Sequence, residues 1–172
     1  KKSFWSILKH RIYVKGYLRK VVKKIKARAG NHDRSKYTKE EFPIFDKYTK
    51  KLKTLKFGSD EYKKALKKMK PALDYHYKRN RHHPEHFQRV PLCVFGEEYC
   101  TAECVGKNGY SDCNHPLVNM DLIDLLEMLA DWKASSRING DGDYMKSMQI
   151  CRERYNIHGS LYQVLVNTIQ KM

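Results

Sequence analysis

Apolar residues recur at helical spacing along much of this chain, and this periodicity limits the folds that it can adopt. In the first segment, Ile7, Val14, Leu18 and Ile25 follow one another at intervals of seven and four residues. This spacing lines them up on one face of an amphipathic helix over residues 4–29. Alternating strand patterns are weak throughout, and the sequence has no internal repeat. The sequence therefore predicts an all-α fold, a helical bundle.

Helix-capping residues divide the rest of the chain into shorter helices. Thr38 and Glu41 form a capping-box signature, which predicts a helix from Thr38 to about residue 50. Ser59 is typical of the N-cap of a third helix, which Pro71 should kink or restart. Asn119 can cap a further helix. The remaining helical segments are expected over 72–79, 120–136 and 144–155 and from Gly159 onward.

The length and composition place the chain among folded proteins. A chain of 172 residues can bury a core as one domain without disulfides, and a hydrophobic content of 41% is too high for disorder. No run of about 18 apolar residues is present to cross a bilayer, so we expect a protein that does not enter the membrane. We treat residues 1–172 as one helical domain, with residues 87–118 as a cysteine-rich insertion.

Positive charge is concentrated in the N-terminal half. Residues 1–81 contain 27 Lys and Arg against 7 Asp and Glu, whereas residues 82–172 contain 8 against 12, so the two halves carry +20 and −4. Such a basic half attracts a phosphate-rich partner, whether a nucleotide or nucleic acid, or an acidic protein, and salt should weaken the attraction. A solvated helix face without a partner explains the same charge equally well.

Three carboxylates share one face of a predicted helix. Asp124, Glu127 and Asp131 are spaced by three and four residues, which brings them together on that face. If the face is buried, the carboxylates need a cation or hydrogen-bond donors. Taken singly, each could equally belong to a solvent-facing stripe, so the interpretation depends on the histidines elsewhere in the chain.

Histidines occur at several places that could meet these carboxylates. His82 and His83 are adjacent, before Pro84, and adjacent imidazoles on a bent segment can bind one metal or bridge two. His10 lies within the apolar stripe of the first helix, where a hydrogen-bonded core histidine is more frequent than a ligand. The same holds for His76.

The order of these residues adds a family resemblance. A histidine on the first helix, the His32-Asp33 doublet, the His82-His83 pair and a late helical Asp131 follow one another, and this order resembles the HD-domain metal-dependent phosphohydrolases. The resemblance implies an all-α bundle that binds a divalent transition metal (Mn, Fe, Zn, Ni or Co). The metal ligands that it implies are His10, His32, Asp33, His82, His83 and Asp131. Candidates for a second metal or for the outer shell are His76, Glu85, His86 and Asp124.

Four longer segments resemble a second, narrower family. Residues 32–37, 69–77, 80–87 and 120–134 look like a family of uncharacterised proteins that is frequent in bacteriophage and bacterial genomes, and the likeness covers most of residues 5–172. This resemblance implies a protein of the cytoplasm, in a bacterial cell or a phage-infected host. It brings no substrate with it.

The reaction implied by the HD resemblance is hydrolysis of a phosphate ester, with a nucleotide as the expected substrate. A metal-bound water is a strong nucleophile at neutral pH, and nearby cations stabilise charge on the phosphoryl group. We expect Asp33, Glu127 and Lys36 to be catalytic: Asp33 can accept a proton from the water, and Glu127 or Glu85 can act as an outer-shell base or orient a histidine. The phosphate-binding candidates, each equally an ordinary salt-bridge partner, are Arg34, Lys36 and Lys133.

Four of the five cysteines cluster in the inserted segment. Together with a nearby histidine they form a candidate structural zinc site, made of Cys93, Cys100, Cys104, Cys113 and His115. No gap between them is the usual two-residue knuckle, so two disulfides or free thiols stay open as alternatives.

A protein without catalytic activity is the competing interpretation. Its basic face would bind nucleic acid, or a host or virion protein, and the aromatic residues among the lysines would assist by stacking on bases. Replacement of His32 and Asp33 separates the two interpretations, because it should abolish hydrolysis and leave such binding intact.

Overall fold

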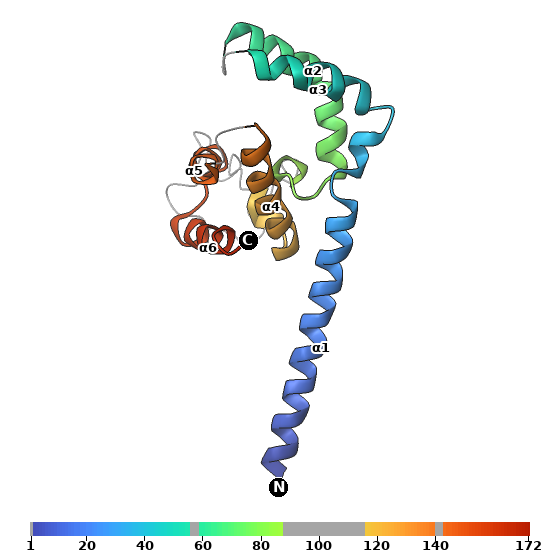
Figure 1. Cartoon of the computed structure of the whole chain (residues 1–172). Helices are drawn as coiled ribbons and strands as arrows, with labels where there is room; N and C mark the ends of the chain where they lie inside the picture. The colour runs from blue at the N-terminus through green and yellow to red at the C-terminus, as the bar shows by residue number, and fades with distance from the viewer. Residues whose placement is uncertain (1, 56–58, 88–115, 140–142) are drawn as a thin grey trace, which may run out of the picture. The chain divides into compact units, whose positions relative to one another are not determined.

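The computed structural model describes residues 2–55, 59–87, 116–139 and 143–172. Within these ranges it contains six α-helices, three short 3-10 helices and no strand (Figure 1), so the all-α prediction is confirmed for the described part of the chain. The chain divides into two compact units, residues 1–32 and residues 33–172.

The first unit contains one long helix, α1, which spans Lys2–Asn31. It confirms the first predicted helix and continues through Gly16 without a break. Its sequence has no acidic residue, and large apolar side chains such as Trp5 and Leu18 are exposed. Among the described residues, no helix is both long enough and apolar enough to span a membrane.

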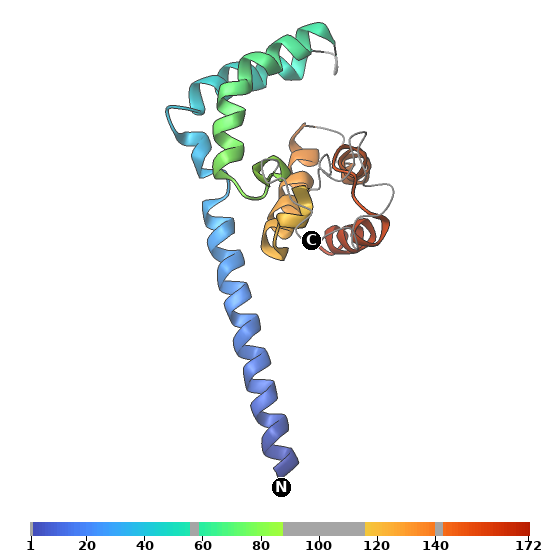
Figure 2. The same cartoon turned by 180° about the vertical axis from the view of Figure 1, so that it is seen from behind.

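The second unit begins with the 3-10 helix η1 (Arg34–Tyr37), followed by the helices α2 (Phe42–Thr54) and α3 (Asp60–Arg79). α2 and α3 pack against each other, and they lie side by side in both views (Figures 1 and 2).

The capping box predicted at Thr38 is wrong. α2 begins at Phe42, with Pro43 in its first turn, where the fixed φ of proline suits a helix start. Glu41 precedes the helix, but its side chain makes no capping hydrogen bond. It is instead fully buried and points to a histidine of α3, as described below.

The predicted start of α3 is confirmed. Ser59 Oγ accepts a hydrogen bond from the backbone N–H of Tyr62 at 3.2 Å, which satisfies one of the donors left open in a first helical turn. α3 runs through Pro71 as one helix and changes direction along its length in Figure 2, as expected of a helix with an internal proline.

The rest of the second unit consists of the 3-10 helices η2 (Pro84–Phe87) and η6 (Pro116–Asn119) and the helices α4 (Leu122–Asn139), α5 (Tyr144–Arg154) and α6 (Gly159–Ile169). The helices α4, α5 and α6 contact one another. The N-cap predicted for α4 is wrong by two residues. Asp121, and not Asn119, caps the helix, because Asp121 Oδ1 accepts hydrogen bonds from the backbone N–H groups of Ile123 and Asp124.

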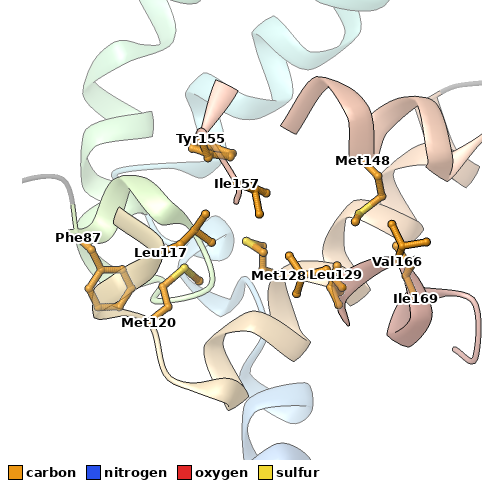
Figure 3. Close-up of a cluster of buried hydrophobic side chains, with 11 residues drawn as sticks. Phe87, Leu117, Met120, Met128, Leu129, Met148, Tyr155, Ile157, Val166 and Ile169 are labelled. Carbon is orange, nitrogen blue, oxygen red and sulfur yellow. The ribbon is translucent and has the colours of Figure 1, made fainter. Parts of the chain in front are cut away.

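An apolar core joins α4, α5 and α6 to the two 3-10 helices η2 and η6 (Figure 3). Met128 and Leu129 of α4 lie at its centre and are almost completely buried. The other buried members are Phe87, Leu117, Met120, Met148, Tyr155, Ile157, Leu165, Val166 and Ile169. This core holds α4 in place, and α4 carries the three predicted carboxylates.

Candidate metal centre

A cluster of histidines and carboxylates lies where η1, the end of α3 and α4 meet. Asp33, His76, His82 and His83 each offer a ligand atom, and these atoms lie within 4.8 Å of one another. Asp33 and His82 also belong to a second set, in which a carboxylate oxygen of Asp131 lies within the same distance of both. Imidazole nitrogens and carboxylate oxygens at this spacing can converge on a metal ion.

The end of α3 brings the three histidines together. His76 lies in the last turn of α3, and Asn80 ends the helix. The side-chain amide of Asn80 donates to the backbone oxygen of His76 at 2.9 Å and to Ser35 Oγ at 2.7 Å. The chain then turns back, and this turn places His82 and His83 beside His76, with ring centroids 6.3 and 4.8 Å away.

Asp33 holds an unusual backbone conformation at the start of η1. Its φ of 54° lies in the left-handed region, which Asp tolerates better than most residues. Its Oδ2 accepts a hydrogen bond from Lys36 Nζ. Burial by itself would raise the pKa of Asp33, but the close approach of His76 and His82 and the hydrogen bond from Lys36 outweigh burial and lower that pKa far below its usual range. Asp33 is therefore a carboxylate at any physiological pH.

His76 forms a pair with a buried carboxylate. Its Nδ1 lies 2.8 Å from Glu41 Oε2, and both side chains are almost completely buried, at 2% and 0% exposed. Because a carboxylate only accepts hydrogen bonds, Nδ1 carries the proton and donates it. The other ring nitrogen, Nε2, lies 3.2 Å from Asp33 Oδ1.

His82 repeats this arrangement with a carboxylate from α4. Its Nδ1 lies 3.2 Å from Glu127 Oε1, and its Nε2 lies 3.4 Å from Asp33 Oδ1. His82 is 1% exposed. Burial by itself would lower the pKa of His82, but the nearby carboxylates of Asp33 and Glu127 raise it above its usual value. Two imidazoles thus meet at one oxygen of Asp33, each with a carboxylate behind it.

His83 completes the cluster as a neutral imidazole. Its Nε2 lies 2.9 Å from His76 Nε2. Burial, followed by repulsion from His82 and His76, lowers the pKa of His83 to about 3, against a smaller opposing attraction from Asp131. A neutral imidazole keeps a lone pair, which is what a metal ligand requires.

The three carboxylates of α4 all face this side of the unit, as their spacing predicted. Asp124 is fully buried and pairs with Arg81, with Nη2 and Oδ2 at 2.8 Å. Glu127 reaches His82, and Asp131 reaches the cluster. The solvent-facing alternative is therefore wrong for Asp124 and Glu127, whose side chains are 0% and 10% exposed.

Other predicted site residues have partners outside the cluster. Glu85 accepts hydrogen bonds from Arg154 Nη2 at 2.6 Å and from the Tyr155 hydroxyl at 2.8 Å. Nδ1 of His86 lies 2.8 Å from the backbone oxygen of Tyr77.

The predicted phosphate-binding residues differ in their surroundings. Lys133 Nζ donates to the backbone oxygen of Ile169 at 2.8 Å and lies over the ring of Tyr144. Lys36 pairs with Asp33, whereas Arg34 is exposed next to Asp33 in the sequence.

The remaining predicted ligands belong to the first unit or fall outside the described residues. His10 is an exposed residue of α1 in the first unit. His32 is the last residue of that unit and is bonded to Asp33, the first residue of the second. The segment from Cys93 to His115, with Cys100, Cys104 and Cys113, lies outside the described residues. Cys151 of α5 is a partly buried thiol, and burial raises its pKa to about 11.

Sequence reasoning missed Glu41. Its spacing from Thr38 fits a capping box, and that local pattern concealed a contact with a residue 35 positions further along the chain. The adjacent sequence offered no clear signal, because the neighbours Phe42 and Pro43 are both exposed.

The fold and the site together define a class of protein. Its described residues contain helices and no strand, and they enclose a buried cluster of histidines and carboxylates. The chain belongs to the family of unknown function DUF5662, which matches residues 1–171. No curated protein and no solved structure matches the chain. The membership agrees with the resemblance to an uncharacterised family, whereas the wider resemblance to HD-domain hydrolases stays a prediction from the sequence.

Proposed function

We propose that this chain is a metal-dependent phosphohydrolase of the HD type, with its cation bound by the cluster around Asp33. The observation that supports the proposal most is the pair of buried imidazoles, His76 and His82. Each has Nδ1 on a carboxylate and Nε2 within 3.4 Å of the same Asp33 oxygen. In metal centres a carboxylate behind a histidine fixes the tautomer and the orientation of the ligand.

The donor set suits a divalent transition metal. Nitrogen from imidazole and oxygen from carboxylate favour Mn, Fe, Co, Ni or Zn over the hard cations that prefer oxygen alone. Asp33 and His82 belong to both sets of candidate ligands, whereas His76 and His83 belong to one set and Asp131 to the other. His32 and His10 stay predicted ligands on the strength of the sequence resemblance.

The residues around the cluster have distinct tasks in the proposed reaction. A bound divalent cation supplies an activated water and stabilises negative charge on a phosphoryl oxygen. Lys36 holds Oδ2 of Asp33, so that Oδ1 stays turned to the imidazoles. Glu127 accepts a hydrogen bond from Nδ1 of His82 and so orients that ring. Arg34, exposed beside Asp33, supplies positive charge for the substrate phosphate.

The proposed substrate is a nucleotide or another small phosphate ester. The net charge of +16 favours capture of an anion, and phosphate esters are among the anions whose hydrolysis a metal held by such donors supports. The charge does not distinguish one nucleotide from another.

Elemental analysis combined with a hydrolysis assay tests the proposal. The purified protein, Asp33→Ala and His82→Ala are incubated with Mn, Fe or Zn, desalted and analysed, then assayed on a panel of nucleotides. His158→Ala is the matched control, because His158 is exposed at the start of α6 and contacts Ser160. The wild type and the control should hold metal and hydrolyse a nucleotide, and both site variants should lose both properties.

Two other results would change the conclusion. A wild type that holds no metal after all three incubations would contradict the proposal. Zinc that stays in Asp33→Ala at the same level as in the wild type would place the metal elsewhere, with Cys93, Cys100, Cys104, Cys113 and His115 as the predicted ligands.

A nucleic-acid-binding protein without activity is the second candidate function. The observation that favours it is that residues 1–32 contain eleven Lys and Arg and no Asp or Glu. Phosphate contacts from such a segment release counterions, so affinity for a nucleic acid duplex should fall steeply with salt. Affinity that hardly changes with salt would remove this candidate.

A further inference from the structure

We infer that Glu41 is a positioning residue of the proposed metal centre, which orients His76 so that its Nε2 faces the cation. The inference rests on the proposed function. No part of the sequence pattern assigned Glu41 to the site, and the residue touches no atom that would react.

The direction of the hydrogen bond between Glu41 and His76 fixes the position of a proton. Glu41 Oε2 lies 2.8 Å from His76 Nδ1 and can only accept, so the proton of His76 is fixed on Nδ1. Nε2 then points to the cluster, 3.2 Å from Asp33 Oδ1 and 2.9 Å from His83 Nε2. Without this contact the imidazole could carry its proton on Nε2, where it would block a cation.

Glu41 is itself held in place by the start of α2. Its backbone oxygen accepts hydrogen bonds from the N–H groups of Ile44 and Phe45 at 3.1 and 3.0 Å, in the first turn of α2. The ring of Phe45 also packs edge-on against His76, with centroids 5.7 Å apart. The same turn of helix therefore fixes both the carboxylate and one wall of the imidazole.

Burial of the Glu41 carboxylate is costly for the stability of the fold. Glu41 is 0% exposed, and within the described ranges its Oε1 has no hydrogen-bond partner. A buried, incompletely satisfied carboxylate destabilises a fold, and the capping bond that would give it a structural role is absent. Residues that violate the rules of stability in this way are expected at functional sites.

Measurement of cation affinity in a Glu41→Gln variant tests the inference. Gln keeps the size of the side chain but offers an amide that can also donate, so it no longer imposes one tautomer on His76. The dissociation constant for Zn²⁺ or Co²⁺, measured by chelator competition, should rise about 10- to 100-fold, the loss typical of outer-shell partners. Glu40→Gln is the matched control, because Glu40 is the exposed neighbour of Glu41, and it should bind as the wild type does.

Long-range ¹H–¹⁵N spectra of the Zn²⁺-loaded wild type give a readout that a purely structural hydrogen bond would not predict, because only a metal ligand loses the proton of its Nε2. His76 should carry a proton on Nδ1 and none on Nε2. A proton that stays on Nε2 in the Zn²⁺-loaded protein would overturn the inference, even if Glu41→Gln fails to fold.

The outcomes also separate this inference from the proposed function. A folded Glu41→Gln protein with unchanged cation affinity would overturn the role of Glu41 and leave the metal centre standing. A wild type that binds neither cation would overturn both.

Discussion

α4 has two buried faces of opposite chemistry. On one face Met128 and Leu129 pack into the apolar core, and on the other Glu127 and Asp131 reach the histidine cluster. Burial of the apolar face stabilises the fold directly. Burial of the polar face removes charged groups from water. The hydrogen bonds and ion pairs that they form in exchange contribute at best a small net gain in folding free energy.

The difference indicates that stability and function are divided between the two faces. If stability alone were required, apolar side chains of similar volume would serve on both faces, because such replacements of buried ion pairs are often neutral or stabilising. The side chains that meet the polar face of α4 come from distant parts of the chain, namely Asp33, His76 and His82, and their ligand atoms lie close to one another. The side chains of the apolar core only pack against one another.

The largest effect is expected from the apolar face. Leu129→Ala removes a side chain that is 1% exposed and should lower the free energy of unfolding by about 2–5 kcal/mol, as measured by urea denaturation. The cation affinity of the remaining folded protein should not change. The control is Leu122→Ala, an exposed position in the same helix, which should change stability by about 0.5 kcal/mol or less. A parallel fall in cation affinity would show that the two faces are not independent.

The next effect is expected from the polar face. Glu127→Gln removes the carboxylate behind His82 and should weaken Zn²⁺ binding about 10- to 100-fold, with a smaller fall in the urea midpoint of the metal-free protein than Leu129→Ala causes. Titration calorimetry measures the first and denaturation the second. Glu153→Gln changes an exposed acid of α5 and serves as the control. If Glu127→Gln lowers only stability, the polar face is a structural network.

The sequence was sufficient for features that depend on local periodicity. The helices, the cap at Ser59 and the shared face of Asp124, Glu127 and Asp131 all follow from residues a few positions apart. These features depend on backbone geometry alone, because residues three and four apart always lie on one side of a helix.

The sequence was insufficient where tertiary contacts compete with local patterns. Thr38 and Glu41 fit a capping box, yet the burial of Glu41 against His76 replaces that local bond. Asn119 and Asp121 are both good capping residues, but Asn119 is the last residue of η6, so Asp121 caps α4. The partners of His76 were also not predictable from local patterns, because they come from three separate segments.

The smallest effects are expected from pH, and they should differ in sign for two neighbouring histidines. The pKa of His82 is raised by Asp33 and Glu127, so the stability from its proton is present below its ordinary pKa of 6.5 and is lost as pH rises through the raised value. The pKa of His83 is lowered to about 3. The unfolded chain therefore takes up a proton below pH 6.5 that the folded protein resists, and stability falls from there towards pH 3.

Urea midpoints at pH 5 and pH 7, on chelator-treated protein, measure this opposition. His83→Gln should lose less stability than the wild type between pH 7 and pH 5, because the group that resists protonation is gone. His82→Gln should lose more stability than the wild type over this range, because the variant lacks the imidazole whose protonation stabilises the folded protein at pH 5. If both variants shifted in the same direction, the two imidazoles would share one protonation state. The cluster would then not hold one neutral ring ready for a cation beside one that must first release its proton.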